Sequence, residues 1–156
     1  MKGILADINI QGQVDLLAAI MQGEPWKLFW DDLKLRYVRF VEIGLAPDSL
    51  DSLIWETCQK EELVLITDNR NEDDPDSLEA TIRARNTAAS LPVFTIANVP
   101  HLGASRAYAE RVIDKMFDFL TRIDSLRGTG RWYLPEDQQR TLLGTRCRRE
   151  LRERDP

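Results

Sequence analysis

The sequence has few of the residues on which several common kinds of site depend. Its 156 residues include one histidine, His101, and two cysteines, Cys58 and Cys147. The cysteines lack the spacing of a metal-binding motif, and so few of them favour a reducing compartment, so we expect a cytoplasmic protein. A lone histidine and the absence of a Gly-x-Ser-x-Gly motif argue against a Ser-His-Asp hydrolase.

Long apolar runs and phosphate-binding glycine motifs are absent as well. The longest apolar run covers residues 16–21, whereas a membrane span needs about 20 residues. The first residues, 1–4, lead directly into a strand-like run and do not have the form of a signal peptide. Neither Gly-x-x-x-x-Gly-Lys-Ser/Thr nor Gly-x-Gly-x-x-Gly occurs, which argues against the two commonest nucleotide-binding loops.

Acidic residues outnumber basic ones, 26 to 21, and the net charge is −5. This balance argues against binding of nucleic acid through bulk charge. Residues 68–79 hold six acids and one arginine, which equals the total charge of the chain, whereas residues 140–156 hold six arginines and three acids. We therefore expect one domain over residues 1–135 and an Arg-rich charged tail over residues 136–156.

Short apolar runs alternate with helical patterns along the chain. The runs are rich in Ile, Val and Leu, as buried parallel strands are. They cover residues 3–8, 37–43, 63–67 and 93–97. Alternating strands and helices predict a parallel sheet covered on both faces. The expected fold is a three-layer α/β/α domain with a mainly parallel sheet of four to five strands.

The helices are predicted from apolar residues at helical spacing and from capping signals. They cover residues 14–21, 25–33, 50–58, a segment starting at 76, and 104–124. Asp48 or Ser49 is suited to cap the third helix, and Asp76 with Glu79 has the spacing of a capping box. Trp55 falls off the apolar stripe of its helix, which leaves open a protein interface there.

Two further segments have simpler interpretations. Pro25 fits the first position of the second helix, and the tryptophans at 26 and 30 are expected to pack in the core. Residues 127–131, Arg-Gly-Thr-Gly-Arg, are typical of a turn, and a short extended piece follows up to residue 135. His101 is expected on the surface, in a loop.

Acidic residues follow two of the predicted strands and start one helix. Asp7 lies at the end of the first strand, Asp68 follows the third, and Asp51 lies in the first turn of a helix. Ligands of parallel sheets bind beyond the carboxyl ends of the strands, so the three carboxylates are expected to converge there. Such a cluster suits a hard cation such as Mg²⁺ or Mn²⁺, which can activate water and stabilise charge on a phosphodiester.

Structural roles account for several other acids. Asp48 and Asp51 are ordinary residues for a helix N-terminus, where the helix dipole favours negative charge. Residues 72–74 are typical of a solvated loop. Asp7 and Asp68 are not explained by capping, so they carry the functional interpretation.

The order of these residues resembles the PIN-like domains of bacterial toxin-type ribonucleases. The resemblance rests on Ile4-Leu-Ala-Asp7, on Asp51 at a helix start, and on Leu63-Val-Leu-Ile-Thr-Asp-Asn-Arg-Asn71, and it covers about residues 3–100. It implies an α/β/α fold and divalent-metal-dependent cleavage of single-stranded RNA, with Asp7, Asp51 and Asp68 as catalytic metal ligands. It further implies a protein partner such as an antitoxin, in a toxin–antitoxin pair.

The third acidic position departs from the family pattern. The family places aspartates two and four residues after the threonine, where this chain has Asn69 and Asn71. An asparagine can bind an ion through its carbonyl oxygen but brings no charge, so these two residues are assigned an assisting role. Glu79 or Asp76 is a candidate for the missing carboxylate.

Two other functions remain open from the sequence. The first is a PIN-like module that binds protein or RNA without cleavage, because of the two asparagines. The second is a phosphatase-like α/β domain with Asp7 as nucleophile, since Asp7-Ile-Asn9 matches an Asp-x-Asp motif that has lost its second acid; Lys115 would have to serve as its lysine. A homodimer is also compatible with the sequence, as dimers are the commonest assembly.

Overall fold

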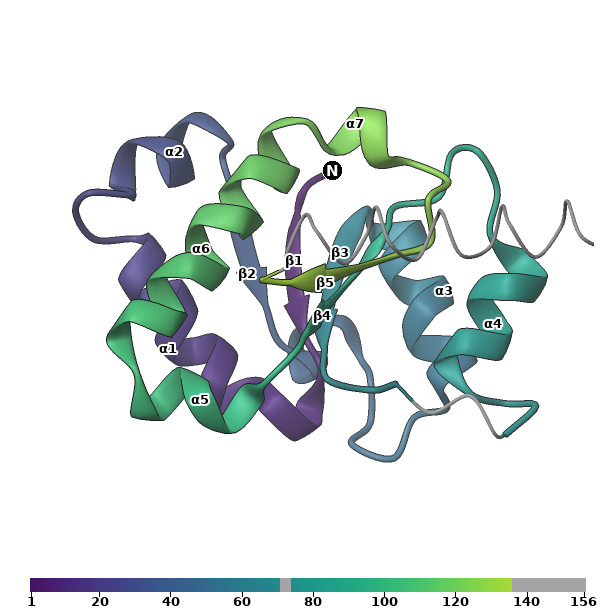
Figure 1. Cartoon of the computed structure of the whole chain (residues 1–156). Helices are drawn as coiled ribbons and strands as arrows, with labels where there is room; N and C mark the ends of the chain where they lie inside the picture. Colours follow the sequence, from purple (N-terminus) through teal and green to yellow (C-terminus); the bar gives the residue numbers. More distant parts are fainter. Residues whose placement is uncertain (71–73, 136–156) are drawn as a thin grey trace, which may run out of the picture.

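A five-stranded parallel sheet forms the centre of the protein (Figure 1). The computed structural model describes residues 1–70 and 74–135. The strands are β1 (Gly3–Ala6), β2 (Arg36–Val38), β3 (Leu63–Thr67), β4 (Val93–Ile96) and β5 (Arg131–Leu134), in the order β2-β1-β3-β4-β5. The predicted extended piece before residue 135 is therefore the fifth strand, at one edge of the sheet.

Helices cover both faces of this sheet. The α-helices are α1 (Gln11–Met21), α2 (Lys27–Asp32), α3 (Asp51–Glu61), α4 (Leu78–Arg85), α5 (Val99–Ala104), α6 (Arg106–Thr121) and α7 (Ile123–Leu126). Two 3₁₀ turns, η1 (Ile8–Ile10) and η2 (Phe40–Ile43), follow the first two strands. Figure 1 shows α1, α5 and α6 on one side of the sheet and α3 and α4 on the other. The predicted three-layer α/β/α fold is confirmed.

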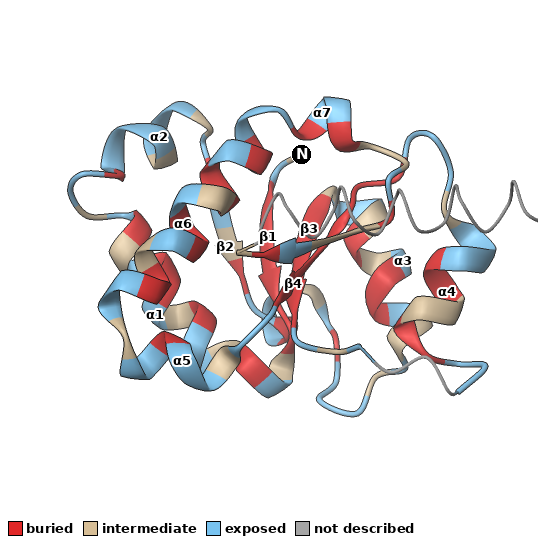
Figure 2. Ribbon diagram, in the orientation of Figure 1, coloured by how far each residue is buried: buried red, intermediate tan, exposed pale blue. Residues whose placement is uncertain are grey.

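The core is divided by the sheet into two apolar layers (Figure 2). Successive strand residues alternate between the layers: Ile4 packs with α1 and α6, whereas Leu5 packs with α3. The apolar stripe predicted for the last long helix is buried throughout. Within the described ranges, no helix is both long and apolar enough to cross a membrane.

Several predicted element boundaries are wrong. The strand expected over 37–43 ends at Val38, because a 3₁₀ turn starts at Phe40, where Glu42 Oε2 accepts a hydrogen bond from Arg39 N at 2.7 Å and Gly44 is left-handed. The helix expected over 104–124 is three helices, of which α5 starts earlier and takes His101 out of the predicted loop. His101 is nevertheless exposed.

The predicted helix faces and caps also need correction. Trp55 is buried, at 5% exposure, whereas Leu50 and Leu53 are exposed. Turning α3 in this way buries the larger aromatic surface, which contributes more to the core than a leucine. No side chain caps α3, and Ser77 rather than Asp76 caps α4, by accepting a hydrogen bond from Ala80 N at 3.1 Å.

The second helix differs from its prediction in a similar way. It begins at Lys27, so Pro25 precedes it. Trp26 is buried and Trp30 is half-buried against the same core, as expected, whereas Phe29 of the same helix is 49% exposed. A helix of six residues is too short to bury a complete stripe.

The strand order fixes where the chain reverses direction across the sheet. From β1 the chain moves to β2 on one side, and it then returns to β3 on the other side of β1. Ligands of open parallel sheets bind in the crevice at such a point, beyond the carboxyl ends of the two strands. Asp7 and Asp68 directly follow the two strands concerned.

Candidate functional site

Asp7 is the buried carboxylate at this switch point. Its backbone N–H donates to the carbonyl of Ile66 at 2.9 Å, which continues the β1–β3 ladder by one residue. The residue is 7% exposed, and its Oδ2 accepts a hydrogen bond from Thr67 Oγ1 at 2.6 Å. Burial raises the pKa of Asp7, and the charges of Asp68 and Asp51 raise it further, against the lowering effect of the hydrogen bonds from Thr67 and from the backbone of Asn9. The group is thus an acid held in an environment that disfavours its charge.

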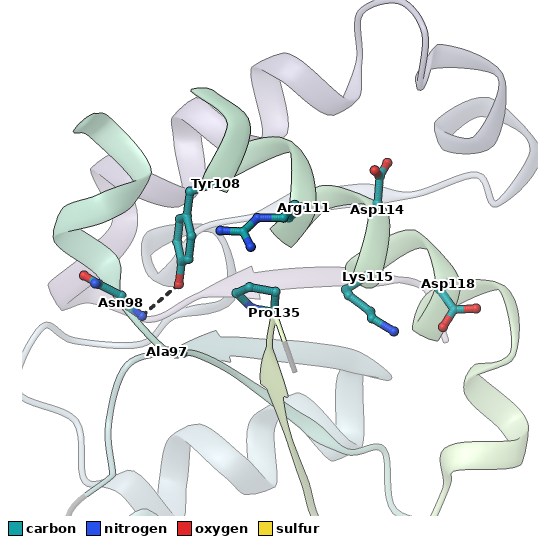
Figure 3. A pocket seen from close by; sticks show the side chains of 8 residues that line it. All are labelled: Ala97, Asn98, Tyr108, Arg111, Asp114, Lys115, Asp118 and Pro135. Carbon is teal, nitrogen blue, oxygen red and sulfur yellow. Dashed lines mark hydrogen bonds between the residues drawn. The ribbon is translucent and has the colours of Figure 1, made fainter. Parts of the chain in front are cut away.

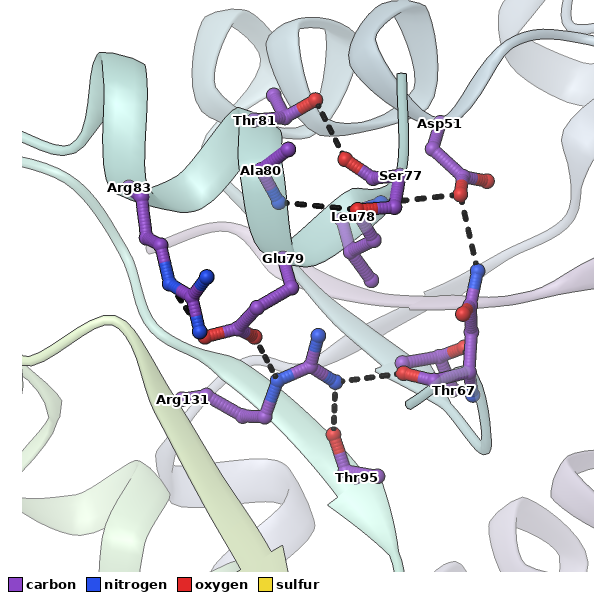
Figure 4. Close-up of polar contacts among 11 residues, drawn as sticks. Asp51, Thr67, Ser77, Leu78, Glu79, Ala80, Thr81, Arg83, Thr95 and Arg131 are labelled. Carbon is purple, nitrogen blue, oxygen red and sulfur yellow. Dashed lines mark hydrogen bonds and ion pairs between the residues drawn. The ribbon is translucent and has the colours of Figure 1, made fainter. Parts of the chain in front are cut away.

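A chain of hydrogen bonds connects Asp7 to Asp51, and Figure 4 draws the part of it nearest Asp51. Thr67 Oγ1, which donates to Asp7, accepts from the backbone N–H of Asn69 at 3.0 Å. The side-chain Nδ2 of Asn69 then donates to Asp51 Oδ2, also at 3.0 Å. These contacts bring three of the predicted site residues, Asp7, Asp51 and Asn69, into one polar network.

Asp51 has a second partner, at the start of α4. Its Oδ2 also accepts a hydrogen bond from the backbone N–H of Leu78 at 3.0 Å. The carboxylate therefore lies between the N-termini of α3 and α4, where the partial positive charge of both helix ends favours it. Asp51 therefore has the structural role expected of an acid at a helix start, and it also belongs to the polar network.

The remaining predicted residues are placed less closely. Asp68 is exposed, and only its charge acts on Asp7. Asn71 and the acids at 72 and 73 lie outside the described residues, as do residues 136–156 with the predicted Arg-rich tail. Asp76 is exposed at the turn before α4, and its backbone N–H donates to Asp74 Oδ1 at 3.0 Å.

Arg131 is a site residue that the sequence analysis missed. Its Nη1 donates to the Asn69 carbonyl at 2.8 Å and to Thr95 Oγ1 at 2.6 Å, and its Nε donates to Glu79 Oε2 at 3.1 Å. The side chain is only 7% exposed, and its Nη2 is buried without a hydrogen-bond partner in the described part of the chain. Figure 4 shows the guanidinium between Glu79 and Thr95, facing the segment that follows β3.

The signal for Arg131 was a pair of threonines in neighbouring strands. Thr67 and Thr95 are register partners in β3 and β4, and both are fully buried. A buried hydroxyl needs a hydrogen-bond partner, and here Thr67 binds Asp7 whereas Thr95 binds Arg131. Glu79, which was predicted to belong to a capping box, instead forms an ion pair with Arg131.

Arg70, in the segment that follows β3, contacts backbone at the end of β4. Its Nη2 donates to the carbonyls of Ile96, at 3.3 Å, and of Ala97. The guanidinium carbon lies 5.6 Å from the ring centroid of Tyr133. Arg70 therefore connects the segment after β3 to the end of β4.

The oxygen atoms at the site are compared here with the ligands that a divalent cation prefers. They are hard oxygens, from the Asp7 and Asp51 carboxylates and the Asn69 amide, and Mg²⁺ prefers such oxygens. Among residues 1–70 and 74–135, no three His, Cys, Asp or Glu side chains are grouped so that they could hold a metal ion. The described residues therefore bring carboxylate and amide oxygens into one network here, but they form no closed protein cage for an ion.

The residues needed for a phosphatase-like reaction do not come together. Asn9 is exposed, and Lys115 lies on α6 in the wall of a separate pocket. The side chain of the single histidine, His101, contacts Tyr108 instead. The two rings pack edge-on, with 4.8 Å between their centroids.

The chain was also compared with known proteins. Models of protein families, curated proteins and solved structures were searched, and none of them matches this chain.

Proposed function

We propose that this chain is a PIN-like, divalent-metal-dependent ribonuclease that cleaves single-stranded RNA at the carboxyl ends of β1 and β3. The observation that carries the proposal is the hydrogen-bond chain from Asp7 through Thr67 and Asn69 to Asp51. It holds two carboxylates on separate elements at the point of the sheet where ligands bind in this class of fold.

The carboxylates have distinct tasks in this proposal. Asp7 is fixed by Thr67 and is destabilised as an anion by burial, so it gains most from a cation beside it. Asp51 is held by Asn69 and by the N-terminus of α4, so it remains in place when substrate approaches. Asp7 and Asp51, assisted by Asn69, would hold Mg²⁺ or Mn²⁺, whose chemistry is to lower the pKa of a bound water and offset charge on the phosphodiester.

A bound cation also bears on the overall charge of the protein. The net charge of −5 disfavours an approaching RNA strand. A cation at Asp7 and Asp51 lowers the negative potential at the point where the phosphodiester must lie. RNA binding is therefore expected to depend on the divalent cation as well as on ionic strength.

Calorimetric titration with Mn²⁺ tests the proposed site directly. Wild type is expected to bind the ion, and Asp7→Asn is expected to bind it at least tenfold more weakly. Asp32→Asn is the matched control, because Asp32 is an exposed acid at the end of α2. Equal Mn²⁺ affinity in wild type and Asp7→Asn would contradict the proposal.

A second function, RNA binding without cleavage, is favoured by one contact. Asn69 stands where the family pattern has an acid, and its amide nitrogen donates to the Asp51 oxygen that a cation would otherwise use. If the chain binds Mn²⁺ and single-stranded RNA but leaves the RNA intact after prolonged incubation, this second function is the correct one.

A further inference from the structure

A row of side chains crosses the carboxyl end of the sheet, from the carboxylate network to the edge strand β5. Thr67 on β3 is the register partner of Thr95 on β4, and Thr95 is the register partner of Tyr133 on β5. On the other side of β3, Asp7 continues the β1 ladder, because its backbone N–H donates to the carbonyl of Ile66. Register partners of parallel strands point to the same face of the sheet, so these side chains form one row.

The contacts of β5 agree with this placement. Arg131 Nη1 donates to Thr95 Oγ1 at 2.6 Å, and Tyr133 lies two residues further along the strand, so it points to the same face as Arg131. Trp132, between them, points to the opposite face, where its ring centroid lies 5.2 Å from that of Phe119 on α6. Tyr133 is therefore on the face of the sheet that carries the network.

Tyr133 is the exposed end of this row. It is 37% exposed, whereas Asp7 is 7% exposed and the two threonines are fully buried. Three strand spacings separate β1 from β5, and neighbouring strands lie about 4.8 Å apart, which places Tyr133 about 14 Å from Asp7. A few nucleotides of an unpaired strand can cover such a span.

A guanidinium group lies beside the exposed ring. The Arg70 guanidinium carbon is 5.6 Å from the ring centroid of Tyr133, and Arg70 Nη2 donates to the backbone carbonyls of Ile96 and Ala97. These contacts hold the positive charge of Arg70 next to the ring. An exposed aromatic ring with an arginine beside it is the arrangement on which proteins stack the bases of single-stranded nucleic acids.

A second tyrosine–arginine pair, on the other face of the sheet, lacks this exposure. Arg111 lies over the ring of Tyr108 on α6, again with 5.6 Å between the guanidinium carbon and the ring centroid. Tyr108 is 6% exposed, and its hydroxyl accepts a hydrogen bond from the backbone N–H of Asn98 at 3.0 Å, as Figure 3 shows. The ring of Tyr108 is thus part of the core, and only the ring of Tyr133 offers a base both an arginine and open surface.

We propose that Tyr133 stacks an unpaired base of the RNA strand whose phosphodiester lies at Asp7 and Asp51. The inference rests on the proposed function for its class of substrate, and it adds a subsite for a base at the edge of the sheet. Stacking on a ring is nearly independent of base identity, because every base has a π-face. The subsite therefore favours single strands over duplexes, in which the bases are already stacked and paired.

Binding of a short oligouridylate to the full chain tests this subsite. The comparison strand has the same length and the same phosphates but carries abasic residues. Both affinities are measured at low ionic strength and with EDTA, so that neither strand is cleaved and both lose the contribution of a divalent cation equally. Wild type is expected to bind the oligouridylate about fivefold or more tightly than the abasic strand, the lower end of the range for stacking of one base.

Variants of the ring locate the effect. Tyr133→Leu is expected to bind the oligouridylate no more tightly than the abasic strand, whereas Tyr133→Phe keeps the ring and is expected to keep the wild-type preference. Phe29→Leu is the matched control. Phe29 is 49% exposed and packs against Phe117 of α6, on the other face of the sheet, so its removal is expected to leave the preference unchanged.

The outcome is independent of catalysis. Because EDTA removes the cation, absence of Mn²⁺ binding or of RNA cleavage would contradict the ribonuclease proposal without changing the ratio of the two affinities. Equal affinity of wild type for the two strands, equal affinity of wild type and Tyr133→Leu for the oligouridylate, or no binding of the oligouridylate would overturn the inference. None of these results would exclude cleavage of RNA at the carboxylate network.

Discussion

Asp7 is the residue at which folding and the proposed function conflict most. It is buried, its pKa is raised, and Thr67 is its side-chain hydrogen-bond donor. Such strain is common where a protein keeps a charge in place for a ligand, because the substitution that would relieve it also removes the function. The same residue therefore yields a stability prediction as well as a functional one.

Asp7→Asn is expected to stabilise the fold at neutral pH by about 0.5–2 kcal/mol. The folded pKa of Asp7 lies above the unfolded one, so ionisation costs stability as the pH rises from the unfolded pKa towards the folded pKa, and the cost is absent below both. The advantage of the variant should thus be small near pH 4 and reach a plateau at higher pH. Urea unfolding between pH 4 and pH 8 measures it, and a pH-independent difference would contradict the raised pKa.

Cys58 provides a second prediction at the residue scale. It is 1% exposed, and burial, together with the charge of Asp7, raises the pKa of its thiol to about 12. In a Cys147→Ser background, Cys58 is expected to resist alkylation at pH 8 in the native state and to react fully in denaturant, because the thiolate is the reactive form. Rapid labelling of the native protein would show that the face of α3 that carries Cys58 is not packed against the sheet as described.

At the scale of elements, β1 depends on the absence of a side chain at its first residue. A Cβ on Gly3 would lie 2.2 Å from the backbone oxygen of Arg36 on β2. Gly3→Ala is therefore expected to destabilise the protein by about 2 kcal/mol or more, since backbone cannot move aside as a side chain can. Because Asp7 directly follows β1, Mn²⁺ affinity should fall together with the stability.

Gly12 is the matched control for this substitution. It is exposed in α1, and a Cβ there meets nothing within 4 Å. Gly12→Ala is expected to stabilise the protein by about 0.5–1 kcal/mol, because alanine loses less backbone entropy in a helix. Equal effects of the two substitutions in thermal unfolding would contradict the β1–β2 packing.

The elements also show what can be predicted from local sequence. The buried strand Leu63–Thr67 is confirmed, and the apolar stripe of α6 is confirmed, because each has one strong periodicity. The prediction of a strand over 37–43 was wrong because a short 3₁₀ turn with its own cap, Phe40–Ile43, interrupts this apolar run. The buried face of α3 was predicted wrongly because the helix has two apolar faces, and only packing against the sheet decides which of them is buried.

At the scale of the whole molecule, Arg131 joins parts of the chain that are far apart in sequence. It connects β5 to the Asn69 segment, to Thr95 on β4 and to Glu79 on α4, over separations of 62, 36 and 52 residues. Such contacts leave no signal in the residues around Arg131 itself, which is why the sequence predicted Asp7, Asp51 and Asn69 but not the arginine that donates to the Asn69 carbonyl. The carboxyl edge of the sheet could be predicted, and its partners across the fold could not.

Arg131→Gln is expected to destabilise the protein by about 2–4 kcal/mol, because it leaves Glu79 and Thr95 without their partner in a largely buried position. Arg122→Gln is the control, since the Arg122–Asp118 ion pair is half exposed and should contribute less than about 1 kcal/mol. Urea unfolding compares the two variants. Equal losses of unfolding free energy would show that Arg131 contributes no more to stability than a residue of a surface ion pair.

The proposed ribonuclease function requires that the Asp7–Asp51 network cleave RNA. The most direct measurement follows labelled single-stranded RNA with metal-free protein, before and after addition of Mn²⁺. Wild type and Asp32→Asn are expected to cleave the RNA only once the ion is added, and Asp7→Asn is expected to lose at least a hundredfold in rate while remaining folded. Cleavage by Asp7→Asn at the wild-type rate, or intact RNA with metal-loaded wild type, would contradict the account.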